Sequence, residues 1–183
     1  VERIERLITD YSQMLKDEAS LSRAKMAKID LANVVDSVVE DFNSDLVNSN
    51  KNIKIFVNNS NLNGSKLNVL GVESKLEQII ANLLDNSISF SPSNSKISVI
   101  CNTKKEDAQL IIEDEGPGFN EKNIDQIFNR FYSNRPEKFG EHSGLGLNIV
   151  KNIIELHGGS VIASNQPGKK KGAKIEVLLP IYK

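Results

Sequence analysis

The sequence contains little cysteine, few aromatic residues and no large excess of either charge. Cys101 is the single cysteine among 183 residues, so no internal disulfide can form, and we expect a core or half-buried thiol in a reducing compartment. The formal net charge of −1 gives no overall field that would attract nucleic acid or a membrane. No apolar run approaches the roughly 20 residues that span a bilayer. The charged opening "VERIERLITDY" has no initiator Met or signal peptide, and we expect an excised part of a longer protein.

The hydrophobic residues show two periodicities that alternate along the chain and predict an α+β fold. Helical spacing predicts helices at about 1–28, 31–47, 74–90, 121–130 and 145–157. Alternating or continuous apolar runs predict strands at about 52–58, 67–71, 96–104, 108–114, 160–166 and 173–180. Asp30 is the expected cap of the second helix, and Gly158-Gly159 ends the last one. The pattern predicts that hairpins connect the last strands, which favours a mixed sheet with helices on one face.

The first predicted helix has a short heptad seam. Ile4, Leu7, Tyr11 and Met14 alternate by three and four, with charged residues between them. Two heptads also fit an ordinary surface helix. The seam alone therefore leaves pairing with a second helix open.

The stretch "NLLDNSISFSP" contains two asparagines four residues apart within an amphipathic helix. Asn is a poor helix former, and this spacing places Asn82 and Asn86 on one face. Their amide oxygens could bind a hard cation such as Mg²⁺. Equally, the amides could bond to neighbouring backbone.

The stretch "IIEDEGPGF" leads from a strand into a glycine turn. Asp114 ends the strand, and Gly116 and Gly118 follow it. A carboxylate there could accept a hydrogen bond from the exocyclic amine of adenine, with the glycines allowing close approach. An ordinary strand-ending turn is the alternative.

The stretch "GEHSGLGLNIV" leads from a glycine loop into an apolar helix. Such a helix start presents unpaired N–H groups to an anion, which favours phosphate binding over a mere glycine cap. It is neither a P-loop nor a Rossmann fingerprint, because the residues and the spacing differ.

In this order the stretches resemble the ATP-binding domain of bacterial two-component sensor histidine kinases, within the superfamily of gyrase, Hsp90 and MutL. "EQIIANLLDNSISFSP" looks like the N box, "DEGPGF" like the G1 box, "IFNRFY" like the F box, and "SGLGLNIVKNIIELHGG" like the G2 box with its helix. The resemblance covers residues 29–183. Residues 1–28 resemble the second helix of the dimerisation and phosphotransfer hairpin.

The resemblance implies a Bergerat-type two-layer α/β sandwich, with a mixed sheet under three helices and ATP held between the helices and a lid. It assigns Asn86 to Mg²⁺ and Asn82 to the phosphate side. ATP-hydrolysing relatives usually have a Glu at the Asn82 position. An amide has no useful basicity, which favours phosphoryl transfer to a protein over hydrolysis. Arg130 would be a cation near the terminal phosphates.

The resemblance also assigns the remaining contacts. Asp114 would bind adenine above a floor shaped by Gly116 and Gly118, with Phe90 near the nucleotide or packed in the core. The segment Ser143–Gly146, with Gly144, Leu145 and Gly146, would hold phosphates through backbone N–H groups. The charged segment 134–143 is expected to be a lid that moves when no nucleotide is bound.

Neither histidine of the chain has the context of a phosphate acceptor. His142 lies in the glycine loop, and His157 ends a helix, where it would interact with the helix dipole. The resemblance therefore implies that the acceptor histidine lies outside this chain, which should bind ATP or ADP with Mg²⁺ but not phosphorylate itself. Expected partners are that histidine, a response regulator and, in the full-length protein, a second copy; the expected location is the cytoplasmic side of an inner-membrane sensor.

Two other functions remain possible at this stage. A serine kinase of the anti-sigma-factor type would usually lack the heptad helix, and transfer to an added protein's serine would identify it. A scaffold that has lost catalysis would not need Asn82, Asn86, Asp114 and Gly144 together.

Overall fold

The computed structural model describes residues 12, 25–47, 49–130, 132, 144–166, 168 and 171–183, without the side chains of residues 121–123. The heptad seam, the predicted lid, Ser143 and His142 lie outside these residues. Within the described part of the chain, no helix is both long and apolar enough to cross a membrane.

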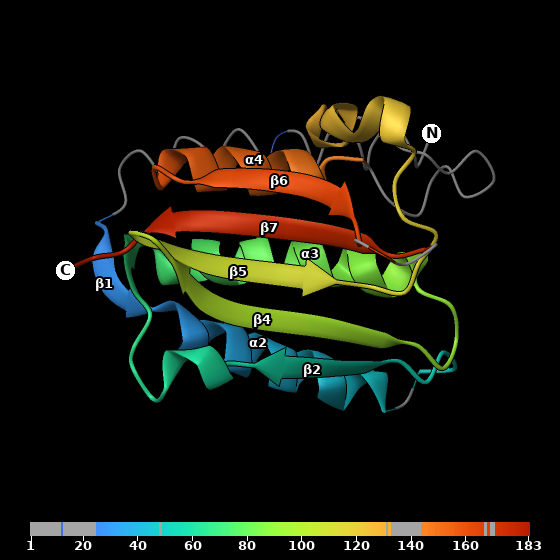
Figure 1. Cartoon of the computed structure of the whole chain (residues 1–183), viewed down its shortest axis with the longest axis horizontal. Coiled ribbons are helices and arrows are strands. Elements are labelled where there is room, and N and C mark those ends of the chain that lie inside the picture. The colour runs from blue at the N-terminus through green and yellow to red at the C-terminus, as the bar shows by residue number, and fades with distance from the viewer. Residues whose placement is uncertain are drawn as a thin grey trace.

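A five-stranded mixed sheet forms one layer, in the order β2-β4-β5-β7-β6. Its strands are β2 (Lys54–Asn58), β4 (Lys96–Lys104), β5 (Asp107–Glu113), β6 (Ser160–Asn165) and β7 (Ala173–Pro180). β2 pairs with β4 in parallel, and the other neighbours are antiparallel. The helices α2 (Leu31–Leu46), α3 (Glu73–Phe90) and α4 (Gly146–Leu156) cover one face of this sheet (Figure 1). The predicted α+β fold, a mixed sheet under three helices, is confirmed.

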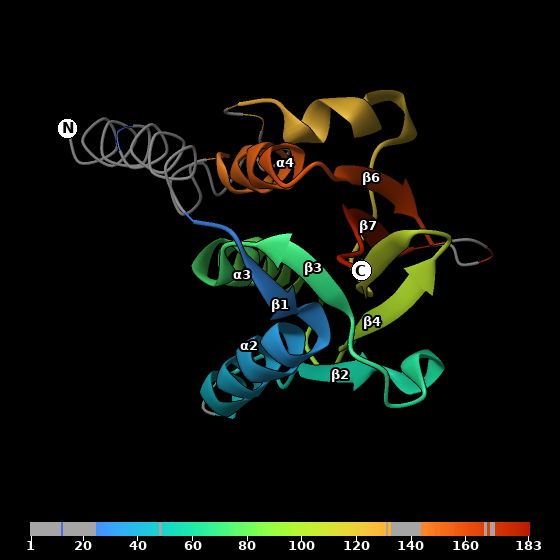
Figure 2. The same ribbon diagram turned by 90° about the vertical axis from the view of Figure 1, so that its left-hand side faces the viewer.

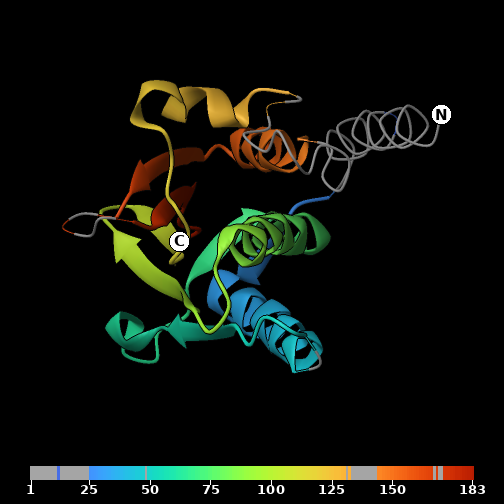
Figure 3. The ribbon, with the colours of Figure 1, turned by 90° about the vertical axis from the view of Figure 1, so that its right-hand side faces the viewer.

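Two opposite views, each turned by 90° from Figure 1, show the helical layer from the side (Figures 2 and 3). α3 lies between α2 and α4 and packs against both. Its apolar stripe, at most 2% exposed, fills the core against the sheet: Leu76, Ile79, Ile80, Leu83 and Leu84. Cys101 of β4 is also fully buried, as predicted. Helical spacing placed these side chains on one face, and their burial is the main source of stability in this layer.

A two-stranded ribbon accompanies the main layers. Its strand β3 (Asn68–Gly71) was predicted, whereas β1 (Ala27–Asp30) and the pairing of the two strands were not. β1 pairs antiparallel with β3. The expected first helix therefore cannot extend to Lys28, although the domain division at residue 28 stays a prediction. Asp30 caps α2 as predicted, with Oδ1 accepting from the Ala32 N–H at 3.3 Å, and it also accepts from the Leu67 N–H at 3.1 Å.

The segments between the strands contain two short 3₁₀ helices. η1 (Ser60–Leu62) follows β2 and was not predicted. η2 (Glu121–Phe128) occupies the segment where a helix was predicted at about 121–130, and its geometry is that of a 3₁₀ helix.

A lysine distant in sequence closes the C-terminal end of α3. Lys51, between α2 and β2, donates from Nζ to the carbonyls of Ile88 at 2.9 Å, Ser89 at 3.1 Å and Ser91 at 3.3 Å. The last turn of α3 has no basic residue of its own. Lys51 therefore satisfies carbonyls that the helix leaves unpaired and places positive charge at the negative end of its dipole.

We expect Lys51→Met to lower the free energy of unfolding by about 1–2 kcal/mol, because charge-assisted hydrogen bonds to the end of α3 are lost while the aliphatic stem remains. Urea unfolding would measure the change. Lys66→Met, at an exposed lysine, is the matched control and should unfold like the wild type. Equal stability of both variants would show that Lys51 does not stabilise this helix end.

Candidate functional site

The start of α4 faces the asparagine pair of α3. A Cβ atom built on Gly146 would lie 3.7 Å from Asn82 Oδ1 and 3.8 Å from Asn86 Nδ2. The two stretches are 60 residues apart in the sequence, yet only a glycine separates the amides from the first turn of the helix. The structure thus brings together the two features that were predicted separately to bind a cation and an anion.

The N-terminus of α4 keeps the properties of an anion site. Its cap residue is Leu145, and among the described residues no side chain caps the first turn. The N–H groups there remain available, and the helix dipole favours a negative group beside them. The Leu145 side chain is 1% exposed, so only its backbone could contact a ligand. Gly144 has φ +70°, a conformation that residues with a Cβ rarely adopt.

Asp114 lies buried beyond the end of β5, 6% exposed. Its Oδ1 accepts hydrogen bonds from the N–H of Gly116 at 2.9 Å and of Ala173 at 3.2 Å. The Ser87 hydroxyl of α3 also bonds to this carboxylate. Burial raises the pKa of Asp114, and the hydrogen bonds from Gly116, Ala173 and Ser87 oppose that rise.

The glycines of the turn make room for close packing. A Cβ on Gly116 would lie 2.9 Å from Asp114 Oδ1 and 3.1 Å from the Phe90 carbonyl oxygen, so the turn lies directly against the end of α3. Gly118 has φ +79°, and its Cβ would lie 2.6 Å from Asn165 Oδ1. Gly118 therefore accommodates a neighbouring side chain, a reason that the sequence did not reveal.

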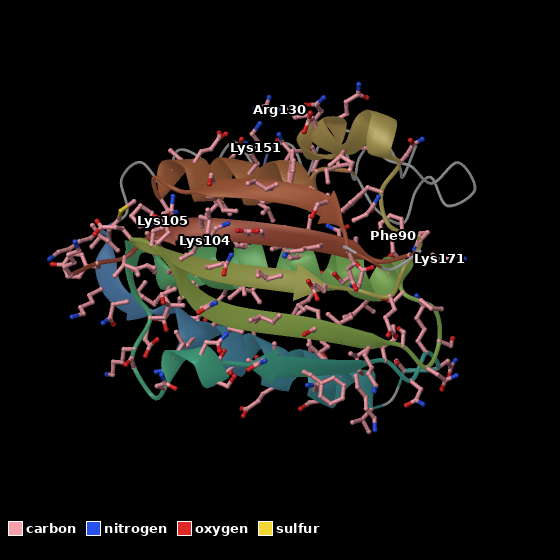
Figure 4. All side chains as sticks on the ribbon, in the orientation of Figure 1. Phe90, Lys104, Lys105, Arg130, Lys151 and Lys171 are labelled. Carbon is pink, nitrogen blue, oxygen red and sulfur yellow. The ribbon has the colours of Figure 1, made fainter. Side chains whose placement is uncertain are left out.

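Phe90 and Arg130 lie on the surface around this region. Phe90, in the last turn of α3, is 41% exposed, which excludes the alternative of a fully packed core residue. Arg130 is exposed and follows η2. Figure 4 places it beside η2 and α4, with Phe90 toward the right-hand end of the sheet. Asn148 of α4 donates to the Phe128 carbonyl at 3.0 Å and so links the segment before Arg130 to α4.

Sequence reasoning missed four polar residues of this region: Ser87, Asn148, Asn165 and Gln166. All four are within hydrogen-bonding distance of the predicted segments. Asn148 offered one signal, because an amide at the start of an otherwise apolar helix needs a partner. The others bond to residues far away in the sequence, which no local pattern shows.

The donor set fits an adenine nucleotide with a divalent cation. A buried carboxylate suits an exocyclic amine, and a helix N-terminus suits phosphates. Among the described residues, no group of three or more His, Cys, Asp or Glu side chains could hold a metal ion. An amide pair beside a phosphate site is consistent with Mg²⁺, which usually takes few protein oxygens and completes its shell with phosphates and waters.

Residues 71–183 match the family described as histidine kinase-, DNA gyrase B-, and HSP90-like ATPase. The chain belongs to this family. Among curated relatives of this ATPase family, the sensor protein ChvG of Rhizobium meliloti (strain 1021) is 37% identical over 98% of this chain. The sensor protein kinase PmrB of Pseudomonas aeruginosa is 28% identical over the same share. The chain spans 32% and 36% of the length of these relatives, about a third.

Solved structures of sensor histidine kinases share the fold of this family member. The mycobacterial sensor histidine kinase MprB superposes with a TM-score of 0.73 at 28% identity, over 85% of this chain and 97% of that one. The catalytic domain of the histidine kinase ThkA gives a TM-score of 0.73 at 22% identity, over 86% and 97%. The predicted family resemblance is confirmed.

We expect Asp114→Asn to change how stability depends on pH. The folded pKa lies above the ordinary value of 3.8, so protonated Asp114 stabilises the fold fully below 3.8 and this contribution is lost as pH rises through the raised pKa. The amide can still accept from the Gly116 and Ala173 N–H groups. The stability of the wild type relative to the variant should therefore fall as pH rises from below 3.8 towards neutrality. Urea unfolding across this range measures it, and parallel curves would contradict it.

Proposed function

We propose that this chain is the ATP-binding kinase core of a two-component sensor histidine kinase. It would donate the γ-phosphoryl group of ATP to a histidine outside this chain, for onward transfer to an aspartate of a response regulator. The observation that supports this most directly is the close approach of the α4 N-terminus to the asparagine pair. A Cβ atom built on Gly146 would lie within 4 Å of the side-chain amides of Asn82 and Asn86. Family membership and the sensor kinases among the relatives agree with it.

Each predicted residue has a defined task in this proposal. Asp114 accepts a hydrogen bond from the exocyclic amine of adenine, and the backbone N–H groups of Gly144–Gly146 bind the phosphates. Asn86 supplies an oxygen to Mg²⁺, whose chemistry is to neutralise phosphate charge during transfer. Asn82 lies on the phosphate side, where its amide cannot act as the base that hydrolysis needs. Arg130 contributes positive charge near the terminal phosphates.

The surroundings of His157 support a phosphate-accepting histidine that lies outside this chain. Its Nδ1 lies 2.7 Å from the Ile153 carbonyl oxygen, and its Nε2 accepts from the Val72 N–H at 3.2 Å. Both ring nitrogens are thus engaged in a side chain that is buried. The proposed acceptor lies on the hairpin helix that precedes residues 1–28 in the family, in the same or a partner subunit of a homodimer. The whole protein would then be an inner-membrane sensor with this part on the cytoplasmic side.

Calorimetric titration of ADP with Mg²⁺ tests the adenine contact. Asp114→Ala should weaken binding by about tenfold to a hundredfold, because the amine of adenine loses its acceptor. Asp114→Asn should also weaken binding, because its one amide oxygen stays with the Gly116 and Ala173 N–H groups and its NH₂ group cannot accept from the amine. Asp107→Asn, at the other end of β5, is the control and should bind like the wild type. Affinity that is unchanged in both Asp114 variants would refute the assignment of the base site.

Titration at several Mg²⁺ concentrations tests the metal site. We expect Asn86→Ala to remove most of the effect of Mg²⁺ on ADP affinity while retaining binding without the metal, since Asn86 would bind the cation and not the base. Asn102→Ala, on the opposite face of the sheet, serves as the control. A variant with the metal dependence of the wild type would assign Mg²⁺ to other residues.

A further inference from the structure

The last residue of β6 holds the turn after Asp114 at two points. Asn165 Oδ1 accepts from the Phe119 N–H at 2.6 Å, and Asn165 Nδ2 donates to the Phe119 carbonyl oxygen at 3.0 Å. One side-chain amide therefore pairs with the donor and the acceptor of a single residue, much as a neighbouring strand would. Gly118 permits this contact, because any Cβ there would lie 2.6 Å from Asn165 Oδ1.

The next residue holds the beginning of the same turn. Gln166 is buried, and its Nε2 donates to the Asp114 carbonyl oxygen at 2.7 Å. Its backbone N–H donates to the Gly172 carbonyl at 3.0 Å, where β7 is about to begin. A Cβ on Gly172 would lie 2.7 Å from the Asp114 carbonyl oxygen and 2.9 Å from the Gln166 side chain. The segment from Asp114 to Phe119 is thus fixed at both ends by consecutive amides.

Asp114 itself is held by β7, because its N–H donates to the Ala173 carbonyl at 3.1 Å and its carboxylate accepts from the Ala173 N–H at 3.2 Å. Gly116 and Gly118 favour many conformations in the unfolded chain, and their order must come from neighbours. An adenine-binding carboxylate needs a fixed position, because a small displacement lengthens its hydrogen bond to the amine. The amides at the end of β6 supply that order from outside the turn.

We propose that Asn165, assisted by Gln166, is a positioning residue that sets base affinity and the preference for adenine over guanine. It acts through the backbone of the Asp114–Phe119 turn and does not touch the nucleotide. This inference rests on the proposed function, since it takes Asp114 as the base-binding group. Asn165 should not affect phosphate binding, because the proposed phosphate end lies where Gly146 faces Asn82 and Asn86.

Three ligands separate positioning from a general loss of structure. ADP, GDP and inorganic pyrophosphate, each with Mg²⁺, would be titrated by calorimetry into the wild type, Asn165→Ala and Asn165→Asp. The aspartate keeps an oxygen for the Phe119 N–H but has no donor for the Phe119 carbonyl. Ser164→Ala is the control, because adjacent residues of a strand point to opposite faces of the sheet. Thermal unfolding of each variant accompanies the titrations.

Asn165→Ala should weaken the binding of ADP by about fivefold to tenfold and lower the ratio of ADP affinity to GDP affinity. The affinity for pyrophosphate should stay unchanged. Asn165→Asp should show the same pattern, and it provides the measurement if the alanine variant does not fold. Variants with the ADP affinity and base preference of the wild type would overturn the inference. Equal losses for ADP and pyrophosphate would also overturn it, because they indicate a structural role only. A wild type that binds neither ADP nor pyrophosphate would instead refute the proposed function.

Discussion

Helix α3 buries one face completely, while the adjacent face that carries Asn82 and Asn86 stays partly accessible. The apolar stripe of α3 is at most 2% exposed: Leu76, Ile79, Ile80, Leu83 and Leu84. Asn82 and Asn86 are partly exposed and lie at the edge of this stripe. A helix is rigid over this length, so burying the leucine and isoleucine stripe fixes the direction of both amides. The geometry of the candidate phosphate and metal site is therefore a consequence of core packing, and the first turn of α4 needs only a glycine to approach it.

The proposed base end of the candidate site, around Asp114, depends on a balance between burial and hydrogen bonding. Burial of the Asp114 carboxylate disfavours its ionised form, and hydrogen bonds from Gly116, Ala173 and Ser87 favour it. Their donors come from the turn, from β7 and from α3, so the carboxylate joins three parts of the fold. The same crowding explains two glycines, because a Cβ on Gly116 or Gly172 would lie within 3 Å of an Asp114 oxygen. These positions require glycine for packing, independently of any ligand.

Local sequence patterns predicted the helices, the main strands and the family, because each depends on periodicity or on contiguous motifs. They failed at β1, where four residues show no complete alternation. They also missed Ser87, Asn165 and Gln166. The partners of Asn165 and Gln166 are 46 and 52 residues away, so only the folded sheet brings them together. The roles of Asn82, Asn86, Asp114 and Arg130 remain predictions, although the structure groups the first two with Gly146.

The two ends of the candidate site share α3 but otherwise rest on separate supports, and the orientation of α4 decides how the proposed phosphate end is presented. α4 is fixed near its start by Asn148, bonded to the Phe128 carbonyl, and at its end by His157. The His157 ring accepts from the Val72 N–H at the beginning of α3 and lies so close to Gly71 that a Cβ there would be 2.9 Å from its Cδ2. Since Nε2 accepts this bond, Nδ1 must carry the proton and donate to Ile153 within α4 itself. A histidine that sequence reasoning treated as a simple helix end thus joins α4 to the first turn of α3, and two such anchors on an 11-residue helix leave its N-terminus aimed at the asparagine pair.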